Sequence, residues 1–292
     1  MIQKMHRPLT TFVWFFWLAG AVVCGCKPTP EPTQDKPQSH TAGWIIPIGG
    51  GPRTEKLISD LIDYCQLKQG DTILVAPMAS EEPDSAYEYV ARDFEKFGLF
   101  CKKYYFTRED EYIPVSHLNA KVIFFTGGDQ NKLMQALSLP GVADDLQKFH
   151  ITGGHIAGTS AGAAVLSRYM ITGNQLKYSQ YEPTFSRLIT DNIELATGLG
   201  LIRTAIVDQH FIVRSRYNRL FSALFELPDL QGIGIDESTG IVTDDSLAIV
   251  IGSAQVVQMI PGRPMRSGEL IGVRSCMVNI YLPGDTFYLK TR

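Results

Sequence analysis

The chain has 292 residues, of which 45% are hydrophobic, so it can bury a sizeable core as one large domain or two small ones. Its 27 basic and 30 acidic residues give a net charge of -3, which offers no electrostatic reason to expect nucleic acid as a partner. Beyond the N-terminal region the cysteines are Cys65, Cys101 and Cys276, without CxxC or Cys/His spacing, so neither a disulfide framework nor a structural zinc site is indicated.

Residues 1–25 have the layout of a secretory signal, because Lys4 and Arg7 precede an apolar stretch over residues 12–23 and no acidic residue is present. As a helix, this stretch would reach only about 18 Å, short of the roughly 30 Å hydrocarbon core, so a permanent membrane span is not expected. The segment ends in a Cys-Gly-Cys run that resembles the bacterial lipobox, which predicts a lipid on Cys26. An ordinary signal peptide that contains cysteines is the alternative.

Residues 26–42 carry four prolines among polar residues, which predicts an extended tether. Residues 43–292 are then expected to form a single domain. Together with a lipidated Cys26, this organisation predicts a bacterial lipoprotein that hangs from a membrane outside the cytoplasm.

Apolar runs alternate with amphipathic helical patterns in the first half of the domain. Strands are expected at residues 44–48, 72–76, 122–125 and 155–157, with an edge strand at 103–106, and helices at 57–65, 87–97, 130–137 and 142–149. This alternation predicts an α/β fold with a mostly parallel, doubly wound sheet that helices cover on both faces.

Three glycine-rich turns, at residues 49–51, 127–128 and 158–162, each follow an expected strand. Ligands bind at the carboxyl ends of the strands in such sheets, so the three turns should open onto one rim. Neither the phosphate-binding Gly-x-x-x-x-Gly-Lys-Ser/Thr pattern nor a Gly-x-Gly-x-x-Gly run opening a helix is present, so nucleotide binding is not indicated.

The second half begins with a polar stretch, residues 172–192, which predicts a long loop. A short strand at 205–207 leads directly into Asp208, and leucines at helical spacing predict a helix over residues 220–227. The remaining apolar runs are short and separated by turns, which predicts a β-rich C-terminal part. They lie at residues 241–243, 247–251, 256–260 and 278–282.

Ser160 lies in Gly158-Thr159-Ser160-Ala161-Gly162, which fits the Gly-x-Ser-x-Gly elbow between a strand and a helix. The glycines permit a strained turn that presents the serine near the positive end of the helix. A turn that only connects the two elements is the alternative.

A serine nucleophile needs a base and an oxyanion hole. His210 is the best placed base, because it ends an expected strand of the same sheet and so should reach the same rim. The backbone N–H of Ala161 and one from Gly128 or Asp129 are the expected oxyanion donors.

Three arginines, Arg214, Arg216 and Arg219, lie between Ile212 and Leu220 without an acidic residue. They could form a solvated helix face. Alternatively, they would suit a carboxylate-rich substrate, because a guanidinium can clamp a carboxylate with two hydrogen bonds.

Five blocks of sequence, in this order, resemble the cyanophycinases of peptidase family S51. The blocks are residues 126–130 (TGGDQ), 158–164 (GTSAGAA), 198–201 (GLGL), 208–211 (DQHF) with the three arginines, and 232–237 (GIGIDE). The resemblance implies a fold like that of class I glutamine amidotransferases and a serine exopeptidase that needs no metal or other cofactor. It also implies substrates with β-linked aspartyl peptides, such as cyanophycin, from which β-Asp-Arg dipeptides are released.

Carried over by position, the resemblance makes Ser160 the nucleophile and His210 its base. It assigns six residues to the substrate pocket: Gln130, Asp208, Gln209, Arg214, Arg216 and Arg219. For the third member of the triad we nominate Glu182, with Glu194 as the next choice. The sequence departs from the family pattern after the first glycine run, where Pro52 and Arg53 replace an expected acidic residue, and this puts recognition of a substrate arginine side chain in question.

The location outside the cytoplasm favours the scavenging of released polymer or of isoaspartyl peptides over turnover of an internal store. The expected partners are thus an aspartate-rich peptide and a membrane, and a homodimer is compatible with the sequence. A dipeptidase for aspartyl or isoaspartyl dipeptides is the second hypothesis, and an inactive surface binding module is the third. An α/β-hydrolase esterase is disfavoured, because the 50 residues from Ser160 to His210 leave little room for the later strands of that fold.

Overall fold

A computed structural model describes residues 42–178, 180 and 184–289. These residues lie in one compact unit, Ser39–Arg292. The expected signal segment, the tether and Cys26 lie outside the described residues, as does Glu182. None of the helices in the described part has the length and hydrophobicity needed to cross a membrane.

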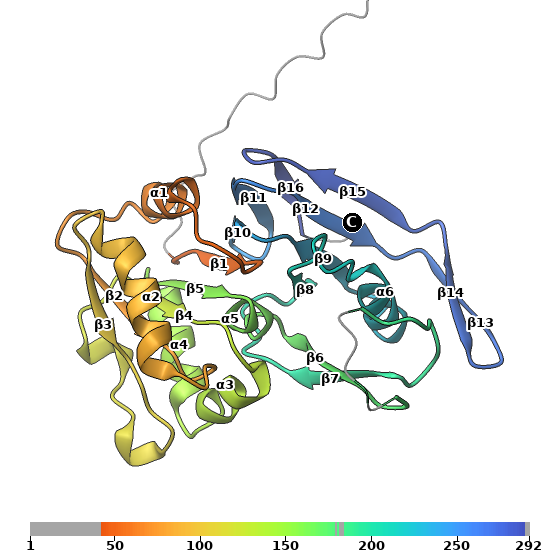
Figure 1. The fold of residues 1–292 in the computed structure, drawn as a ribbon, viewed down its shortest axis with the longest axis horizontal. Helices are drawn as coiled ribbons and strands as arrows, with labels where there is room; N and C mark the ends of the chain where they lie inside the picture. Colours follow the sequence, from red (N-terminus) through yellow and green to blue (C-terminus); the bar gives the residue numbers. More distant parts are fainter. Residues whose placement is uncertain (1–41, 179, 181–183, 290–292) are drawn as a thin grey trace, which may run out of the picture. The chain divides into compact units, whose positions relative to one another are not determined.

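An eight-stranded sheet forms the centre of this unit, in the order β16-β11-β10-β1-β5-β4-β2-β3 (Figure 1). Its strands are β1 (Ile45–Ile48), β2 (Thr72–Ala76), β3 (Phe100–Lys103), β4 (Val122–Phe125), β5 (His155–Thr159), β10 (Thr239–Thr243), β11 (Leu247–Gly252) and β16 (Thr286–Tyr288). The strands from β1 to β3 in this order are parallel, and the other three pair antiparallel. The predicted α/β sheet is therefore confirmed, although its edge strand β3 begins three residues before the expected one.

Helices cover both faces of this sheet, so β1 and β4 are buried on each side. The helices are α1 (Glu55–Tyr64), α2 (Pro83–Glu95), α3 (Gln130–Leu137), α4 (Val142–Ile151) and α5 (Ala161–Ala164), with short 3₁₀ turns at Glu109–Glu111 and Val115–His117. The apolar sides of α1 and α2 pack with Ile46 and Phe124, whereas α3, α4 and α5 pack with Ile45 and Phe125 on the opposite face.

A second, four-stranded sheet has the order β15-β12-β9-β8. Its strands are β8 (Ala205–Gln209), β9 (Gln231–Ile235), β12 (Val256–Ile260) and β15 (Met277–Tyr281). Helix α6 (Tyr217–Glu226) covers one face, where Leu220 and Leu224 pack against Ile206 and Val257. The expectation that the strand before His210 belongs to the same sheet as the strand before Ser160 is wrong, because β8 pairs with β9 in this second sheet.

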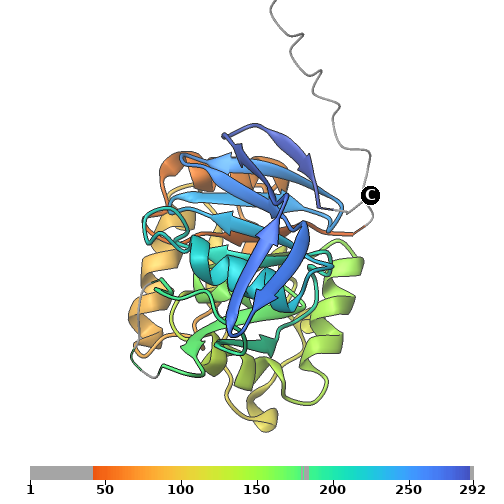
Figure 2. The ribbon, with the colours of Figure 1, turned by 90° about the vertical axis from the view of Figure 1, so that its right-hand side faces the viewer.

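Two hairpins complete the unit. The strands β6 (Tyr169–Gln175) and β7 (Ile193–Thr197) flank the predicted loop, whose first residues belong to β6. The strands β13 (Arg263–Ser267) and β14 (Leu270–Arg274) form a separate ribbon beside α6 (Figure 2). With β9 to β16, the predicted β-rich C-terminal part is confirmed.

Candidate active site

Ser160 lies at the sharp turn between β5 and α5, where its backbone has a φ of 53°. Few residues other than glycine adopt this conformation, and such strain is typical of functional sites. The flanking glycines allow the close approach that the turn needs. A Cβ on Gly158 would lie 2.2 Å from the carbonyl oxygen of Gly162, and a Cβ on Gly162 would lie 2.4 Å from that of Phe125. The predicted elbow is therefore formed.

His210 follows β8 directly and reaches Ser160 from the second sheet. Its Nε2 lies 2.8 Å from the Ser160 Oγ, at hydrogen-bond distance. The backbone of His210 is also strained, with a φ of 49°, and its N–H donates to the carbonyl of Gly49 over 2.7 Å. This backbone bond joins the end of β8 to the end of β1. The two sheets therefore converge at the carboxyl ends of their strands, and this convergence brings the two predicted residues together.

Glu237 holds the other side of the imidazole, since its Oε1 lies 2.6 Å from the His210 Nδ1. It follows the end of β9 by two residues, and β9 is the parallel neighbour of β8. Sequence reasoning missed this residue, although Glu237 ends one of the five blocks that carry the family resemblance. The signal that could have found it is its position after a strand, which Ser160 and His210 share.

The structure does not connect the nominated acids to His210. Glu182 lies outside the described residues. Glu194, on β7, accepts hydrogen bonds from the Thr172 hydroxyl over 2.6 Å and from the Asn174 amide over 2.8 Å. The carboxylate that orients His210 in the described part of the chain is thus that of Glu237.

Burial lowers the pKa of His210 below its usual 6.5, because the charged imidazolium loses solvation. The hydrogen bond to Glu237 opposes this effect, and the positive charges of Arg214 and Arg216 add to it. The imidazole is therefore neutral at neutral pH, the state in which it can accept the proton of a serine hydroxyl.

The glycine turn after β1 packs directly against this pair. A Cβ on Gly50 would lie 2.3 Å from the His210 Cε1, and a Cβ on Gly51 would lie 2.7 Å from the Glu237 Cβ. Both glycines also have positive φ angles, 100° and 70°. Any larger residue at either position would displace the imidazole or the carboxylate.

The predicted oxyanion donors differ in availability. The N–H of Asp129 donates to the carbonyl of Ala79 over 2.9 Å, so it is already used. Gly128 and Ala161 donate no backbone hydrogen bond to any other described residue. Gly127 lies beside the nucleophile, because a Cβ there would be 3.3 Å from the Ser160 Cβ. Of the predicted donors, the N–H groups of Gly128 and Ala161 are therefore the two that remain free to hold an oxyanion.

Four of the residues assigned to the substrate pocket bond to one another instead. Arg219 donates to both carboxylate oxygens of Asp208, with its Nε at 2.7 Å from Oδ2, and to the side-chain oxygen of Gln209 over 2.9 Å. Arg216 donates to the same Gln209 oxygen over 2.6 Å. All four are buried between β8 and α6. We name Asp208, Gln209, Arg216 and Arg219 the β8–α6 charge cluster.

The other two assigned residues lie elsewhere. The side chain of Gln130 is buried and donates to the backbone oxygens of Ile171 and Thr172, so it fastens α3 to β6. Arg214 is exposed in the turn after His210, and its N–H donates to the His210 carbonyl over 3.1 Å. Of the three predicted arginines, only Arg214 has an exposed side chain.

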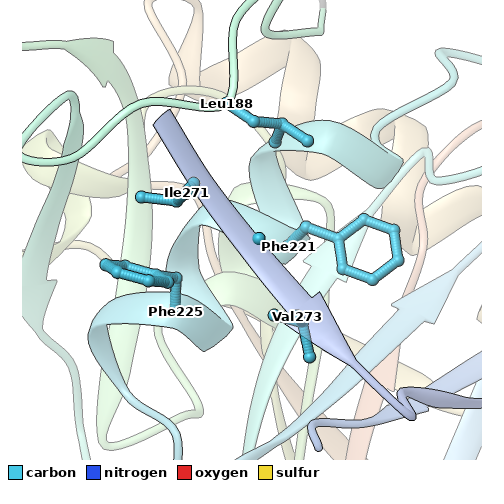
Figure 3. Close-up of a pocket in the computed structure, with 6 residues that line it drawn as sticks. Leu188, Phe221, Phe225, Ile271 and Val273 are labelled. Atoms are coloured by element: carbon cyan, nitrogen blue, oxygen red, sulfur yellow. The ribbon is translucent and has the colours of Figure 1, made fainter. Parts of the chain in front are cut away.

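A cavity of about 250 Å³ lies beside the nucleophile. It is lined by Gly50, Gly51, Arg53, Ala86, Tyr89, Val90, Thr126, Gly127, Thr159, Ser160 and His210. We name it the catalytic cavity. A different cavity, of about 190 Å³, lies between α6 and β14 and is lined by apolar residues that include Phe221, Phe225 and Ile271 (Figure 3). That second cavity has no titratable or nucleophilic side chain in its lining, so it offers no chemistry of its own.

Among the residues that the structure describes, no thiol lines the catalytic cavity. In residues 42–178, 180 and 184–289, no group of three or more His, Cys, Asp or Glu side chains is arranged to hold a metal ion. Cys65, Cys101 and Cys276 are free thiols, and burial raises the pKa of Cys101 to about 12. The reactive groups of the cavity are therefore the Ser160 hydroxyl and the His210 imidazole.

Comparisons of the sequence and of the structure both relate this chain to known peptidases. The profile of peptidase family S51 matches residues 45–251. A cyanophycinase from Trichormus variabilis is 36% identical over 235 residues, which are 75% of this chain and 76% of that protein. A cyanophycinase from Thermosynechococcus vestitus is 30% identical over 279 residues, 89% of this chain and 84% of that protein.

Two solved structures share the fold. A peptidase from an acI-B1 Actinobacterium has a TM-score of 0.62 at 21% identity, covering 86% of this chain and 98% of that one. A putative peptidase E protein from Listeria monocytogenes has a TM-score of 0.52 at 15% identity, covering 73% of this chain and all (100%) of that one.

Proposed function

Because this chain belongs to peptidase family S51 and is a serine-type peptidase, we propose that it is an exopeptidase for β-aspartyl peptides such as cyanophycin, from which it releases β-Asp-Arg dipeptides. The observation that carries this proposal is the 36% identity to a cyanophycinase over three quarters of the chain, together with the Ser160–His210–Glu237 arrangement. An aspartate-rich peptide is the corresponding substrate class.

The geometry supports a covalent mechanism in two stages. In the first, His210 Nε2 takes the proton of Ser160 while Oγ attacks the scissile carbonyl, and Glu237 keeps Nδ1 protonated and the ring in place. The N–H groups of Ala161 and Gly128 stabilise the oxyanion. The imidazolium then gives its proton to the leaving amine, which departs and leaves an acyl-enzyme.

In the second stage, His210 takes a proton from water as the water attacks the acyl carbonyl. The tetrahedral intermediate collapses, the ester bond breaks, and the proton returns to the Ser160 Oγ. Serine, histidine and carboxylate are thereby restored. Each proton moves through the same Nε2, which lies 2.8 Å from Oγ.

We further propose that the enzyme works outside the cytoplasm, held to a membrane by a lipid on Cys26 and by the tether of residues 26–42. The layout of residues 1–25 supports this location. An enzyme there would degrade released polymer or isoaspartyl peptides from its surroundings.

The test is to incubate the protein from Gly43 onward with cyanophycin and with a panel of β-aspartyl dipeptides, and to identify the products by mass. We expect β-Asp-Arg from cyanophycin, and we expect Ser160→Ala to remove all hydrolysis while it keeps the thermal unfolding profile. Hydrolysis of dipeptides alone would favour the dipeptidase instead. Binding without turnover in the unsubstituted protein would favour an inactive binding module, and an active, folded Ser160→Ala would refute the nucleophile.

A further inference from the structure

Arg53 carries the only permanent charge among the residues that line the catalytic cavity in the described part of the chain. Its side chain is only 3% exposed, although it forms part of the cavity wall. A guanidinium shielded from bulk water interacts more strongly with an opposite charge than an exposed one does. The cavity beside Ser160 therefore offers one concentrated positive group to a ligand.

The backbone around Arg53 is tied to the catalytic residues. The Ser238 hydroxyl, next to Glu237, donates to the carbonyl of Pro52 over 2.7 Å. Thr54 caps α1, because its side chain accepts from the Leu57 N–H. Arg53 thus lies between two anchored neighbours, and its Cα is fixed relative to the triad.

The guanidinium itself is held from one side by α2. Its Nε donates to the Asp93 carboxylate over 2.9 Å, and its Nη2 donates to the backbone oxygen of Tyr89 over 3.0 Å. Asp93 is also 3.7 Å from the Lys96 Nζ, so this carboxylate is shared between two cations. Asp93 therefore offsets the charge of Arg53 only in part, while it orients the planar group.

Donor capacity remains on the opposite edge of the guanidinium. Arginine has five N–H donors, and within the described residues Nη1 of Arg53 makes no hydrogen bond. One N–H of Nη1 and the remaining N–H of Nη2 lie parallel at the end of the guanidinium, and such a pair matches the two oxygens of a carboxylate.

The ring of Tyr89 suggests a different ligand for this wall of the cavity, the guanidinium of a substrate arginine. Tyr89 is 51% exposed, and a cation could stack on its ring. However, the Arg53 Cζ already lies 4.4 Å from the centre of this ring, so a second cation there would meet the charge of Arg53. The charge at this wall favours an anion.

We propose that Arg53 forms a carboxylate-binding subsite of the catalytic cavity, which selects peptides whose leaving residue carries a free carboxylate. The inference rests on the proposed function and deepens it, because it names the group that the cavity recognises. An exopeptidase must distinguish a chain end from an internal residue, and a carboxylate beside the scissile amide marks such an end. The side chain of the leaving residue is then secondary, so a C-terminal β-Asp-Arg unit and a C-terminal β-Asp-Ala unit should both be released.

The experiment uses the full chain in mild detergent and three probes. The first is a peptide of two β-Asp-Arg units joined through the aspartyl backbone, the second is the same peptide with an amide at its C-terminal aspartyl carboxyl group, and the third is the peptide with β-Asp-Ala as its C-terminal unit. The amide keeps the guanidinium and removes the carboxylate charge. We compare kcat and KM for the unsubstituted protein, Arg53→Met, Arg53→Lys and the control Arg92→Met. Arg92 lies on α2, is exposed, and does not line the cavity, so its loss makes the same change of charge.

We expect the unsubstituted protein to prefer the acid over the amide by about 10- to 100-fold in kcat/KM, mainly through KM, as for a hydrogen bond between charged groups. Arg53→Met should abolish this ratio, Arg53→Lys should keep part of it, and Arg92→Met should keep all of it. Equal use of acid and amide by the unsubstituted protein, or an unchanged ratio in Arg53→Met, would overturn the inference.

A binding experiment tests this inference independently of the proposed function. In the Ser160→Ala background, calorimetry measures the affinity for the same three probes with and without Arg53→Met. If the unsubstituted protein cleaves no β-aspartyl peptide, the proposed function fails, and an acid-over-amide preference in binding that requires Arg53 would still support the subsite. Binding that depends on the guanidinium, with the amide bound as tightly as the acid and the peptide ending in β-Asp-Ala bound weakly, would mean that Tyr89 recognises the leaving residue and would overturn the subsite.

Discussion

The catalytic cavity and the β8–α6 charge cluster use arginine in opposite ways. In the cluster, the Nε and Nη2 of Arg219 donate hydrogen bonds to the two carboxylate oxygens of Asp208, and the pair is buried. In the cavity, Arg53 bonds to Asp93 along one edge, and its Nη1 remains without a hydrogen bond in the described residues. An arginine that the chain itself satisfies stabilises the fold, whereas one with donors left over can bind a ligand.

The contrast between the two sites predicts that substitutions at the catalytic cavity alter the rate of hydrolysis. Substitutions in the β8–α6 charge cluster should alter the stability of the fold. The largest effect on rate, after loss of the nucleophile, is expected for Glu237→Gln. The amide cannot stabilise the imidazolium and favours the wrong tautomer of His210, so kcat should fall by about 10²- to 10⁴-fold with folding preserved. Steady-state kinetics and thermal unfolding measure the two quantities.

Two matched substitutions make the Glu237 assignment specific. Glu194→Gln, which alters a carboxylate bonded to Thr172 and Asn174, should leave kcat close to that of the unsubstituted protein. Glu182→Gln tests the acid nominated from the sequence. A large loss of kcat in Glu182→Gln beside an active Glu237→Gln would reverse the assignment of the third triad residue.

In the charge cluster, Arg219→Met should lower the free energy of unfolding by about 3–5 kcal/mol, because it leaves the buried Asp208 without its bidentate partner. Urea unfolding measures this loss. The double variant Arg219→Met with Asp208→Asn should recover part of it, since no unpaired charge then remains. Unchanged stability with a raised KM would instead return Arg219 to the role of substrate clamp that the sequence suggested.

Sequence patterns predicted local structure well where burial is continuous. The bounds of β2 and β4 match the expected strands, because apolar runs between turn residues leave few alternatives. The elbow at Ser160 and the base at His210 followed from their positions after strands. The predicted contact is observed, even though β8 belongs to another sheet.

The roles of the arginines and of Glu237 depend on contacts with residues that are distant in sequence, and the sequence does not show these contacts. Three arginines at close spacing have the same appearance whether they face water, substrate or a buried carboxylate. Arg219 pairs with Asp208 only because α6 packs on β8, and that packing is a tertiary property. Glu237 was missed for a related reason, since the register of β8 beside β9 decides which carboxylate reaches His210.

The smallest effect is expected for Arg214→Gln, in the exposed turn after His210. The positive charge of Arg214 helps to lower the pKa of His210, so its removal should raise that pKa. Because the neutral imidazole is the active form, the acidic limb of kcat/KM should move to higher pH, and the movement should be small because the charge of Arg214 is exposed and screened by solvent. Arg266→Gln, which removes an exposed charge on β13, should leave the limb in place. A limb that moved to lower pH in Arg214→Gln would mean that Arg214 acts on His210 through structure rather than through its charge.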